Sequence, residues 1–113
     1  MVPCQDAKVG TSTGVSASDR SNTILALASP TSQPEDFRRP GHIFPVKYRP
    51  GGVLNRTGHT EASVDLVKLA GLRPVSVLSM IVDEDGSVAC LPKLWKFAVE
   101  YNLPIISITD LIR

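Results

Sequence analysis

The residues best suited to chemistry are gathered in one short stretch, Arg56-Thr57-Gly58-His59-Thr60-Glu61-Ala62. It brings together a guanidinium group, two hydroxyl groups, an imidazole and a glycine, just before the first regular apolar pattern of the chain. The first backbone N–H groups of a helix have no partner within that helix and carry a partial positive charge. A helix that begins here therefore predicts a site for an anion.

A second candidate lies upstream, in Arg38-Arg39-Pro40-Gly41-His42-Ile43-Phe44-Pro45. Two guanidinium groups and the imidazole of His42 could act on a ligand, and Ile43 and Phe44 are expected to anchor the segment on the core. A single histidine in a loop is more often a surface residue than a catalyst. The residues alone leave both interpretations of His42 open.

Length and charge exclude several classes of function. With 113 residues the chain fits one small domain, and its formal net charge of +1 gives no strongly basic surface for nucleic acid. Residues 1–58 carry a net charge of +3 and residues 59–113 a net charge of −2, so the positive half adjoins the predicted anion site. No apolar run approaches the roughly 20 residues of a membrane span, and no signal-peptide pattern begins the chain. We expect an intracellular soluble protein that binds neither nucleic acid nor membrane.

Neither the cysteines nor the acidic turn predict a metal site. Cys4 and Cys90 lie far apart and lack the ligand spacing that is typical of zinc sites. Asp83-Glu84-Asp85-Gly86 lacks the alternating carboxylates and later glutamate of a calcium-binding loop. A solvated turn is the better interpretation of these acidic residues.

The first helix is expected over residues 19–28. Ser18 is its predicted N-cap, Asp19 lies in its first turn, and Pro30 follows its end. The hydroxyl-rich residues 10–18 before it have two interpretations, a flexible linker or an ordered loop that leads into the helix.

Three further helical segments follow the anion site. One runs from Thr60 to the vicinity of Gly71, which suits the position after a helix end, and another runs from Pro92 to about Asn102. Trp95 on the latter helix is expected in the core or at an interface. Thr109 is expected to cap a last helical turn.

Loops and strands complete the predicted pattern. Five prolines make residues 30–52 a loop, and residues 51–55 are expected to form a turn and a short extended piece. Residues 75–82 are mostly apolar and predict a buried strand, and residues 103–108 predict a last strand. Helices and strands in this order predict an α/β or α+β domain.

Six motifs follow one another along the chain. They are Gly14-Val15-Ser16-Ala17 followed by Asp19-Arg20, Arg39-Pro40-Gly41-His42-Ile43-Phe44-Pro45, Gly51-Gly52-Val53-Leu54, Arg56-Thr57-Gly58-His59-Thr60-Glu61-Ala62, Leu69-Ala70-Gly71-Leu72 and Asp83-Glu84-Asp85-Gly86. In this order they resemble the motifs of 3,4-dihydroxy-2-butanone 4-phosphate synthase, and the resemblance extends from about Ala7 to the C-terminus. It implies that residues 1–113 are the C-terminal portion of one such domain, with a mixed sheet and flanking helices and with residues 30–52 as an internal loop.

The resemblance also implies an activity. The family consists of lyases of riboflavin biosynthesis, which convert D-ribulose 5-phosphate to 3,4-dihydroxy-2-butanone 4-phosphate and formate. They use Mg²⁺ or Mn²⁺ and usually form homodimers, and some members carry a GTP cyclohydrolase II domain as well. The implied compartment is the cytoplasm or the plastid stroma.

Carried over to this chain, the resemblance assigns roles to individual residues. His42 corresponds to a histidine that is essential for activity, and His59 corresponds to the metal-binding histidine. The loop from Thr11 to Ser18, together with Arg20, becomes part of the wall of the site. The implied substrate-binding residues are Arg56, Thr57, Gly58, His59 and Thr60.

Three departures from the family pattern bear on activity. The acidic N-terminal loop of the family, which supplies a carboxylate metal ligand, is absent from this sequence, and a single histidine does not hold Mg²⁺. Met80 stands where the family has its catalytic glutamate, and a thioether cannot transfer a proton. Val88-Ala89-Cys90 replaces a Met-Ala-Arg segment.

Two hypotheses of different classes follow. In the first, the chain belongs to an enzyme and supports turnover once the absent half of the domain is supplied. In the second, it is a non-catalytic relative that binds sugar phosphate or pairs with an active subunit, and Met80 favours this hypothesis for the chain by itself. In both, we expect uncovered apolar surface and therefore marginal stability or association.

Overall fold

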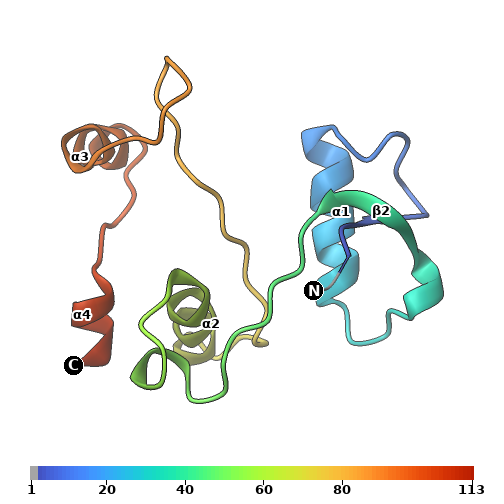
Figure 1. Cartoon of the computed structure of the whole chain (residues 1–113), viewed down its shortest axis with the longest axis horizontal. Helices are drawn as coiled ribbons and strands as arrows, with labels where there is room; N and C mark the ends of the chain where they lie inside the picture. Colours follow the sequence, from blue (N-terminus) through green and yellow to red (C-terminus); the bar gives the residue numbers. More distant parts are fainter. Residues whose placement is uncertain (1–2) are drawn as a thin grey trace.

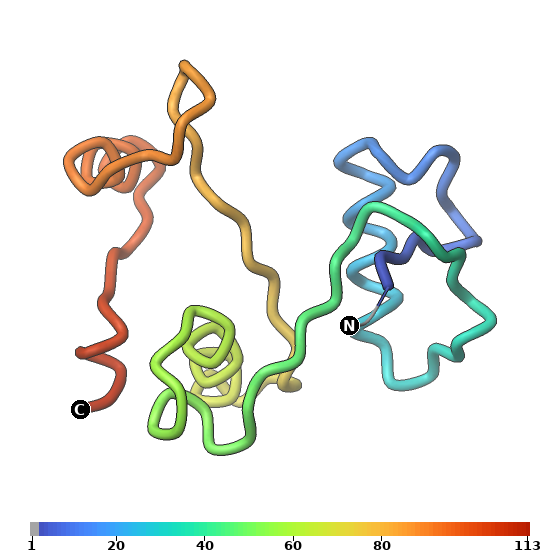
Figure 2. The backbone as a smooth tube through the Cα atoms, viewed as in Figure 1, coloured from blue at the N-terminus to red at the C-terminus, as the bar shows by residue number. Residues whose placement is uncertain are grey.

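The computed structural model describes residues 3–113, which form two small packed units and a helix at residues 91–100 that stands apart from them between extended segments (Figures 1 and 2). None of the helices within these residues is long and apolar enough to cross a bilayer. The elements in chain order are β1 (Gln5–Ala7), α1 (Ala17–Ala28), the 3₁₀ turn η1 (Pro34–Asp36), β2 (Phe37–Ile43), the 3₁₀ turn η2 (Gly52–Leu54), α2 (His59–Leu69), α3 (Leu91–Glu100) and α4 (Ile108–Ile112).

The N-terminal unit is a two-stranded antiparallel sheet, β1 with β2, packed against α1 (Figure 1). Ala7 pairs with Phe37 and both are buried, while Gln5 pairs with Ile43 across an irregular register. Strand β2 lies inside the segment that was expected to be loop, so this expectation was wrong. Pro40 is tolerated because it lies in a strand with only one neighbour, where not every N–H is needed for pairing.

Helix α1 begins two residues earlier than its sequence pattern predicts. Ser16, and not Ser18, is the N-cap, because the Ser16 hydroxyl accepts a hydrogen bond from the backbone N–H of Asp19 at 3.0 Å. Asp19 does lie in the first turn, as expected. One turn further along the helix, the fully buried Thr23 hydroxyl accepts from the N–H of Ala7 and so connects α1 to β1.

The second unit consists of η2, α2 and α4. Residues 51–55 form the 3₁₀ turn η2 instead of the extended piece that was expected, because Gly51 and Gly52 both have positive φ and bend the chain. The carboxylate of Asp65 accepts from the backbone N–H of Val53 at 2.9 Å and fixes this turn on α2. Helix α2 ends at Leu69, and Gly71 follows in the left-handed conformation as predicted.

The two predicted strands near the C-terminus are not formed within the described residues. Residues 75–82 and 103–107 are extended, and β pairing there is limited to an isolated bridge between Val82 and Val88. The reason is physical, since an extended segment becomes a strand only when another segment pairs with it. Between them, α3 forms as expected with Pro92 in its first turn, and α4 is capped by Ser107 instead of Thr109.

The molecule is open for its size. Its radius of gyration is 15.9 Å, whereas about 13 Å is typical of a compact domain of this length. Its accessible surface of 8514 Å² exceeds the roughly 6,100 Å² of a folded monomer of equal mass. Phe44 is 73% exposed and Trp95 54% exposed, so neither residue has the core position considered for it. The α+β class is confirmed, with a small antiparallel sheet in place of the mixed sheet that was expected.

Candidate functional site

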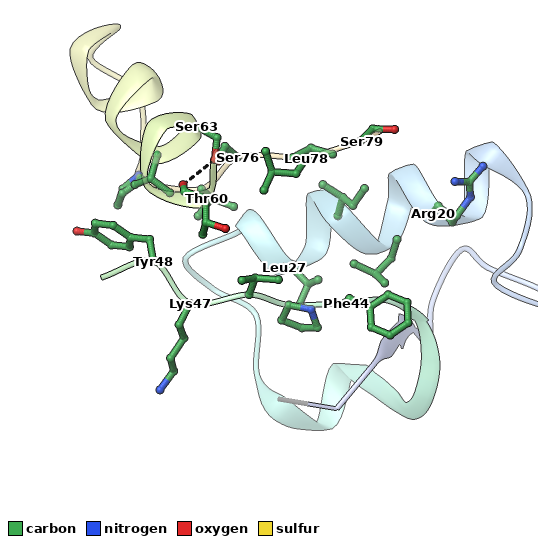
Figure 3. A pocket seen from close by; sticks show the side chains of 18 of the residues that line it. Arg20, Leu27, Phe44, Lys47, Tyr48, Thr60, Ser63, Ser76, Leu78 and Ser79 are labelled. Carbon is green, nitrogen blue, oxygen red and sulfur yellow. Dashed lines mark hydrogen bonds between the residues drawn. The ribbon is translucent and has the colours of Figure 1, made fainter. Parts of the chain in front are cut away.

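A groove of about 860 Å³ lies between the two units (Figure 3). One wall comes from α1, with Arg20 at one end, and the other comes from the first turns of α2 and the extended segment 74–79. Ser76 donates a hydrogen bond from Oγ to Oγ of Ser63 at 2.8 Å, which joins the extended segment to α2. Residues 42–48 form the floor and connect the two units.

The N-terminus of α2 adjoins this groove and is organised by a buried carboxylate. Glu61 is fully buried, and its Oε1 accepts from Nη1 of Arg56 at 2.7 Å, while its Oε2 accepts from the backbone N–H of Arg49 at 3.0 Å. The two hydrogen bonds together fix the chain on both sides of η2. The pKa of Glu61 lies below its ordinary value, mainly because of the hydrogen bond from the Arg49 N–H and to a smaller extent because of the Arg56 guanidinium. The carboxylate therefore stays ionised.

Gly58 is the N-cap of α2, and its size matters more than its conformation. A Cβ at this position would lie only 2.6 Å from Oε1 of Glu61 and 2.5 Å from Nη1 of Arg56. Any other residue would therefore disturb the pair between Arg56 and Glu61. Gly58 has no side chain to cap the helix, so the N–H groups that an N-cap side chain would bond at the start of α2 remain available to an anion.

The structure places the expected site residues on two different surfaces. His42 and Thr60 line the groove, whereas His59 lines an adjoining, mostly apolar cavity of about 460 Å³ between α2 and α4, which shares Ser63 and Leu78 with the groove. Arg56, Thr57 and Gly58 lie outside the walls of both cavities, at the start of α2.

His42 is paired with a buried carboxylate that the sequence did not single out. Its ring Nδ1 lies 3.0 Å from Oδ2 of Asp6, and its backbone N–H donates to Oδ1 of the same carboxylate at 2.8 Å. The backbone N–H of His42 is the main reason that the pKa of Asp6 lies below its ordinary value of 3.8. Asp6 is thus an ionised acceptor at neutral pH.

The hydroxyl-rich loop before α1 is ordered by hydrogen bonds, and the linker interpretation is wrong. Oδ2 of Asp19 accepts from the backbone N–H groups of Ser12 and Gly14, both at 3.0 Å, and from the hydroxyl of Ser12 at 3.1 Å. These bonds hold the pKa of Asp19 below its ordinary value, with the Gly14 N–H as the largest cause. Of the residues expected in this wall, Arg20 lines the groove.

The described residues do not fit a divalent metal ion by themselves. Within residues 3–113, no group of three or more histidine, cysteine, aspartate or glutamate side chains is placed to hold one. His59 is a single imidazole beside an apolar cavity, and Mg²⁺ and Mn²⁺ prefer several oxygen ligands. Met80 is 71% exposed on the extended segment and brings no acid or base to this region.

Sequence reasoning missed Asp6 and Glu61, the carboxylates that position His42 and Arg56. Asp6 lies 36 residues before His42, and no local pattern connects two residues at that distance. Glu61 was detectable in principle, because an acidic residue in the first turn of a helix often interacts with groups at the N-terminus.

Solved structures define the fold of this chain. A 3,4-dihydroxy-2-butanone 4-phosphate synthase of Candida albicans superimposes with a TM-score of 0.93 at 44% identity, over 97% of this chain and 57% of that one. A synthase of the same name in complex with two magnesium ions gives a TM-score of 0.86 at 43% identity, over 97% of this chain and 56% of that one. The fold is therefore that of part of such a domain.

Sequence comparison gives the same result. The chain is 70% identical over 109 residues to the chloroplastic monofunctional riboflavin biosynthesis protein RIBA 3 of Arabidopsis thaliana, covering 96% of this chain and 21% of that protein. It is 58% identical over 106 residues to the riboflavin biosynthesis protein RibBA of Aquifex aeolicus, covering 94% of this chain and 26% of that protein. The chain belongs to the 3,4-dihydroxy-2-butanone 4-phosphate synthase family, whose model matches residues 2–113. It spans about a fifth to a quarter of the length of these two relatives.

Proposed function

We propose that this chain supplies the sugar-phosphate-binding part of a 3,4-dihydroxy-2-butanone 4-phosphate synthase site, with D-ribulose 5-phosphate as the ligand. The observation that carries the proposal is the pair between Arg56 and the buried Glu61 at the uncapped N-terminus of α2. One nitrogen of the guanidinium is bonded to Glu61, while the side chain remains 55% exposed. Its other N–H groups are therefore oriented and available for phosphate oxygens.

In this proposal the residues from Arg56 to Thr60 make different contacts with the sugar phosphate. Arg56 contributes charge, Gly58 lets the backbone N–H groups of α2 approach the phosphate, and Thr57 and Thr60 donate hydroxyl hydrogen bonds to the sugar phosphate. Thr60 lies in the wall of the groove, where the carbon chain of the sugar would extend toward His42. His42 then serves as the group that accepts or returns a proton.

The chain by itself is proposed not to turn over its ligand. A divalent metal ion would polarise the carbonyl and hydroxyl oxygens of the sugar, but His59 offers at most one of the ligands needed. Met80 offers no replacement for a glutamate. Catalysis therefore requires carboxylates from outside the described residues.

A second candidate is a non-catalytic role, in which the chain pairs with another copy or with a related active subunit. The observation that favours pairing is the large apolar surface, including the exposed Val77, Leu78 and Trp95. For the compartment we propose the plastid stroma, because the plant relatives are named as chloroplastic proteins.

Two measurements test the proposal. Ribulose 5-phosphate should raise the melting temperature of the 113-residue chain, and ribulose without phosphate should not, because the proposed contacts are made to the phosphate. Equal effects of the two sugars would contradict it. In parallel, a formate-release assay with Mg²⁺ should show no turnover by the chain alone, and formate production would contradict the requirement for further carboxylates.

A further inference from the structure

The pairing of His42 with Asp6 determines where the proton of a neutral His42 ring resides. A neutral imidazole carries one proton, on either Nδ1 or Nε2, and the bonded neighbour decides which. An ionised carboxylate can only accept hydrogen bonds. Since Nδ1 lies 3.0 Å from Oδ2 of Asp6, Nδ1 must be the donor in this contact.

The surrounding residues leave the Asp6 carboxylate little freedom to move. Its Oδ1 is held by the backbone N–H of His42, and Asp6 itself is buried in β1. Gly14 has a φ of +87°, and a Cβ at this position would collide with the carboxylate, so that the loop closes over Asp6 only because residue 14 is glycine.

The loop that contains Gly14 is itself held by hydrogen bonds to side chains of α1 and β2. Asp19 accepts from the N–H groups of Ser12 and Gly14, and Arg38 donates from Nη2 to the carbonyl oxygen of Ser12 at 3.2 Å. The loop that closes over the Asp6 carboxylate is therefore held between α1 and β2.

We propose that Asp6 is a positioning residue that holds neutral His42 in the tautomer with its proton on Nδ1, so that unprotonated Nε2 is presented to the groove. His42 lines the groove, and its side chain is 44% exposed although Nδ1 is bonded to Asp6. The ring nitrogen that a bound molecule can reach is thus Nε2. An unprotonated nitrogen there accepts a proton from a ligand, which the opposite tautomer cannot do. The tautomer is independent of the proposed function, while its use in proton transfer rests on that function.

The tautomer can be read directly from the ¹⁵N chemical shifts of the two ring nitrogens. The spectrum is taken on the ¹⁵N-labelled 113-residue chain at alkaline pH, about pH 9, so that the neutral rings are observed. His42 should show a protonated Nδ1 and an unprotonated Nε2. His59 serves as the internal reference, because nothing within residues 3–113 forms a hydrogen bond with its ring. If His42 in the wild-type chain carries its proton on Nε2, the proposal is wrong, and this result requires no variant.

Asp6→Asn should reverse the tautomer. The two N–H groups of His42 are bonded to two different oxygens of Asp6, and asparagine replaces one of these oxygens with an NH₂ group, which can only donate. With its oxygen on the backbone N–H, its NH₂ group faces Nδ1, which must then accept, and the proton moves to Nε2. Asp110→Asn makes the same chemical change at α4, where the Asp110 carboxylate accepts from the Ser107 hydroxyl, and should leave His42 unchanged.

The outcomes separate this inference from the proposed function. A His42 proton that stays on Nδ1 in Asp6→Asn would overturn the role of Asp6. A reversed tautomer in that variant would support it. If the tautomer is as expected but ribulose 5-phosphate does not stabilise the chain, the proposed function fails and the inference about Asp6 stands.

Discussion

Nη1 of Arg56 donates to Oε1 of Glu61 at 2.7 Å, joining a half-exposed guanidinium to a carboxylate that is completely buried. Because Oε2 of the same carboxylate accepts from the backbone N–H of Arg49, Glu61 cannot turn without breaking a second bond. The orientation of Arg56 is therefore fixed before any ligand arrives. A pre-oriented guanidinium loses less conformational entropy on binding than a free side chain would.

The first prediction concerns Arg56 as a ligand for phosphate. Arg56→Ala should abolish the rise in melting temperature that ribulose 5-phosphate causes, because it removes the charge that faces the phosphate. Arg56→Lys should restore only part of it, since an ammonium group cannot bind Glu61 and a phosphate with the same planar geometry. Thermal unfolding with and without ligand gives the answer.

A charge-matched control accompanies this measurement. Lys96→Ala removes one positive charge from an exposed position on α3, far from the start of α2 (Figure 1). It should leave the ligand-induced shift unchanged. An unaltered shift in Arg56→Ala would rule out the phosphate role of Arg56.

The second prediction concerns the stability of the chain at acidic pH. Asp19 has a pKa below its ordinary value of 3.8 in the folded chain, so the unfolded chain binds more protons as the pH falls. Its stabilising effect is complete above the unfolded pKa near 4 and is lost as the pH falls through the lower folded pKa. The melting temperature should fall in this range, and Asp19→Asn should be less stable at pH 7 but show a shallower decrease on acidification. Equally steep decreases in the two proteins would contradict the assignment.

The helices of this chain could be predicted closely because their determinants are local. The start of α2, the glycine after its end and the proline in the first turn of α3 all lie within a few residues of what they control. Even so, the predicted cap Ser18 was wrong by two residues, since Ser16 and Ser18 lie close together at the start of α1 and only the packed structure decides between them.

The strands could not be predicted in the same way. Residues 75–82 have the apolar, β-branched composition of a buried strand, but a strand also needs a paired neighbour, and pairing is not encoded in the segment itself. Strand β2 is the opposite case, because Pro40 and Gly41 make the segment look like a loop although it pairs with β1, 30 to 38 residues earlier in the chain. The same long separation hid Asp6, whose role depends entirely on that pairing.

The third prediction distinguishes the two candidate caps of α1. Ser16→Ala removes the acceptor for the N–H of Asp19 and should destabilise the chain by about 1 kcal/mol, the typical loss for an N-cap serine. Ser18→Ala is the matched control, since this hydroxyl lies within the exposed first turn, and its effect should be within about 0.5 kcal/mol. Denaturant unfolding followed by circular dichroism compares the two. A larger loss of stability in Ser18→Ala than in Ser16→Ala would mean that Ser18 is the cap.

The fourth prediction concerns the apolar surface. The accessible surface exceeds that of a compact monomer of this mass by about 2,400 Å², which is the scale of a large protein interface. We expect the isolated chain to bind the dye ANS and to associate at micromolar concentrations, as seen by sedimentation velocity. Val77→Lys on the extended segment should reduce both effects. A monomer that unfolds cooperatively and does not bind ANS would contradict this prediction.

The last prediction concerns Met80, at the position where the resemblance to the synthase family implies a catalytic glutamate. In a polypeptide that also contains the acidic N-terminal loop of the family, Met80→Glu should increase formate release from ribulose 5-phosphate, because it restores a group that can transfer a proton. The side chain is 71% exposed on an extended segment, so glutamate fits without repacking. Met80→Gln is the matched control, with nearly the same shape as glutamate but no titratable proton. If Met80→Gln increases activity as much as Met80→Glu, or if neither does, the missing carboxylate belongs elsewhere in the chain.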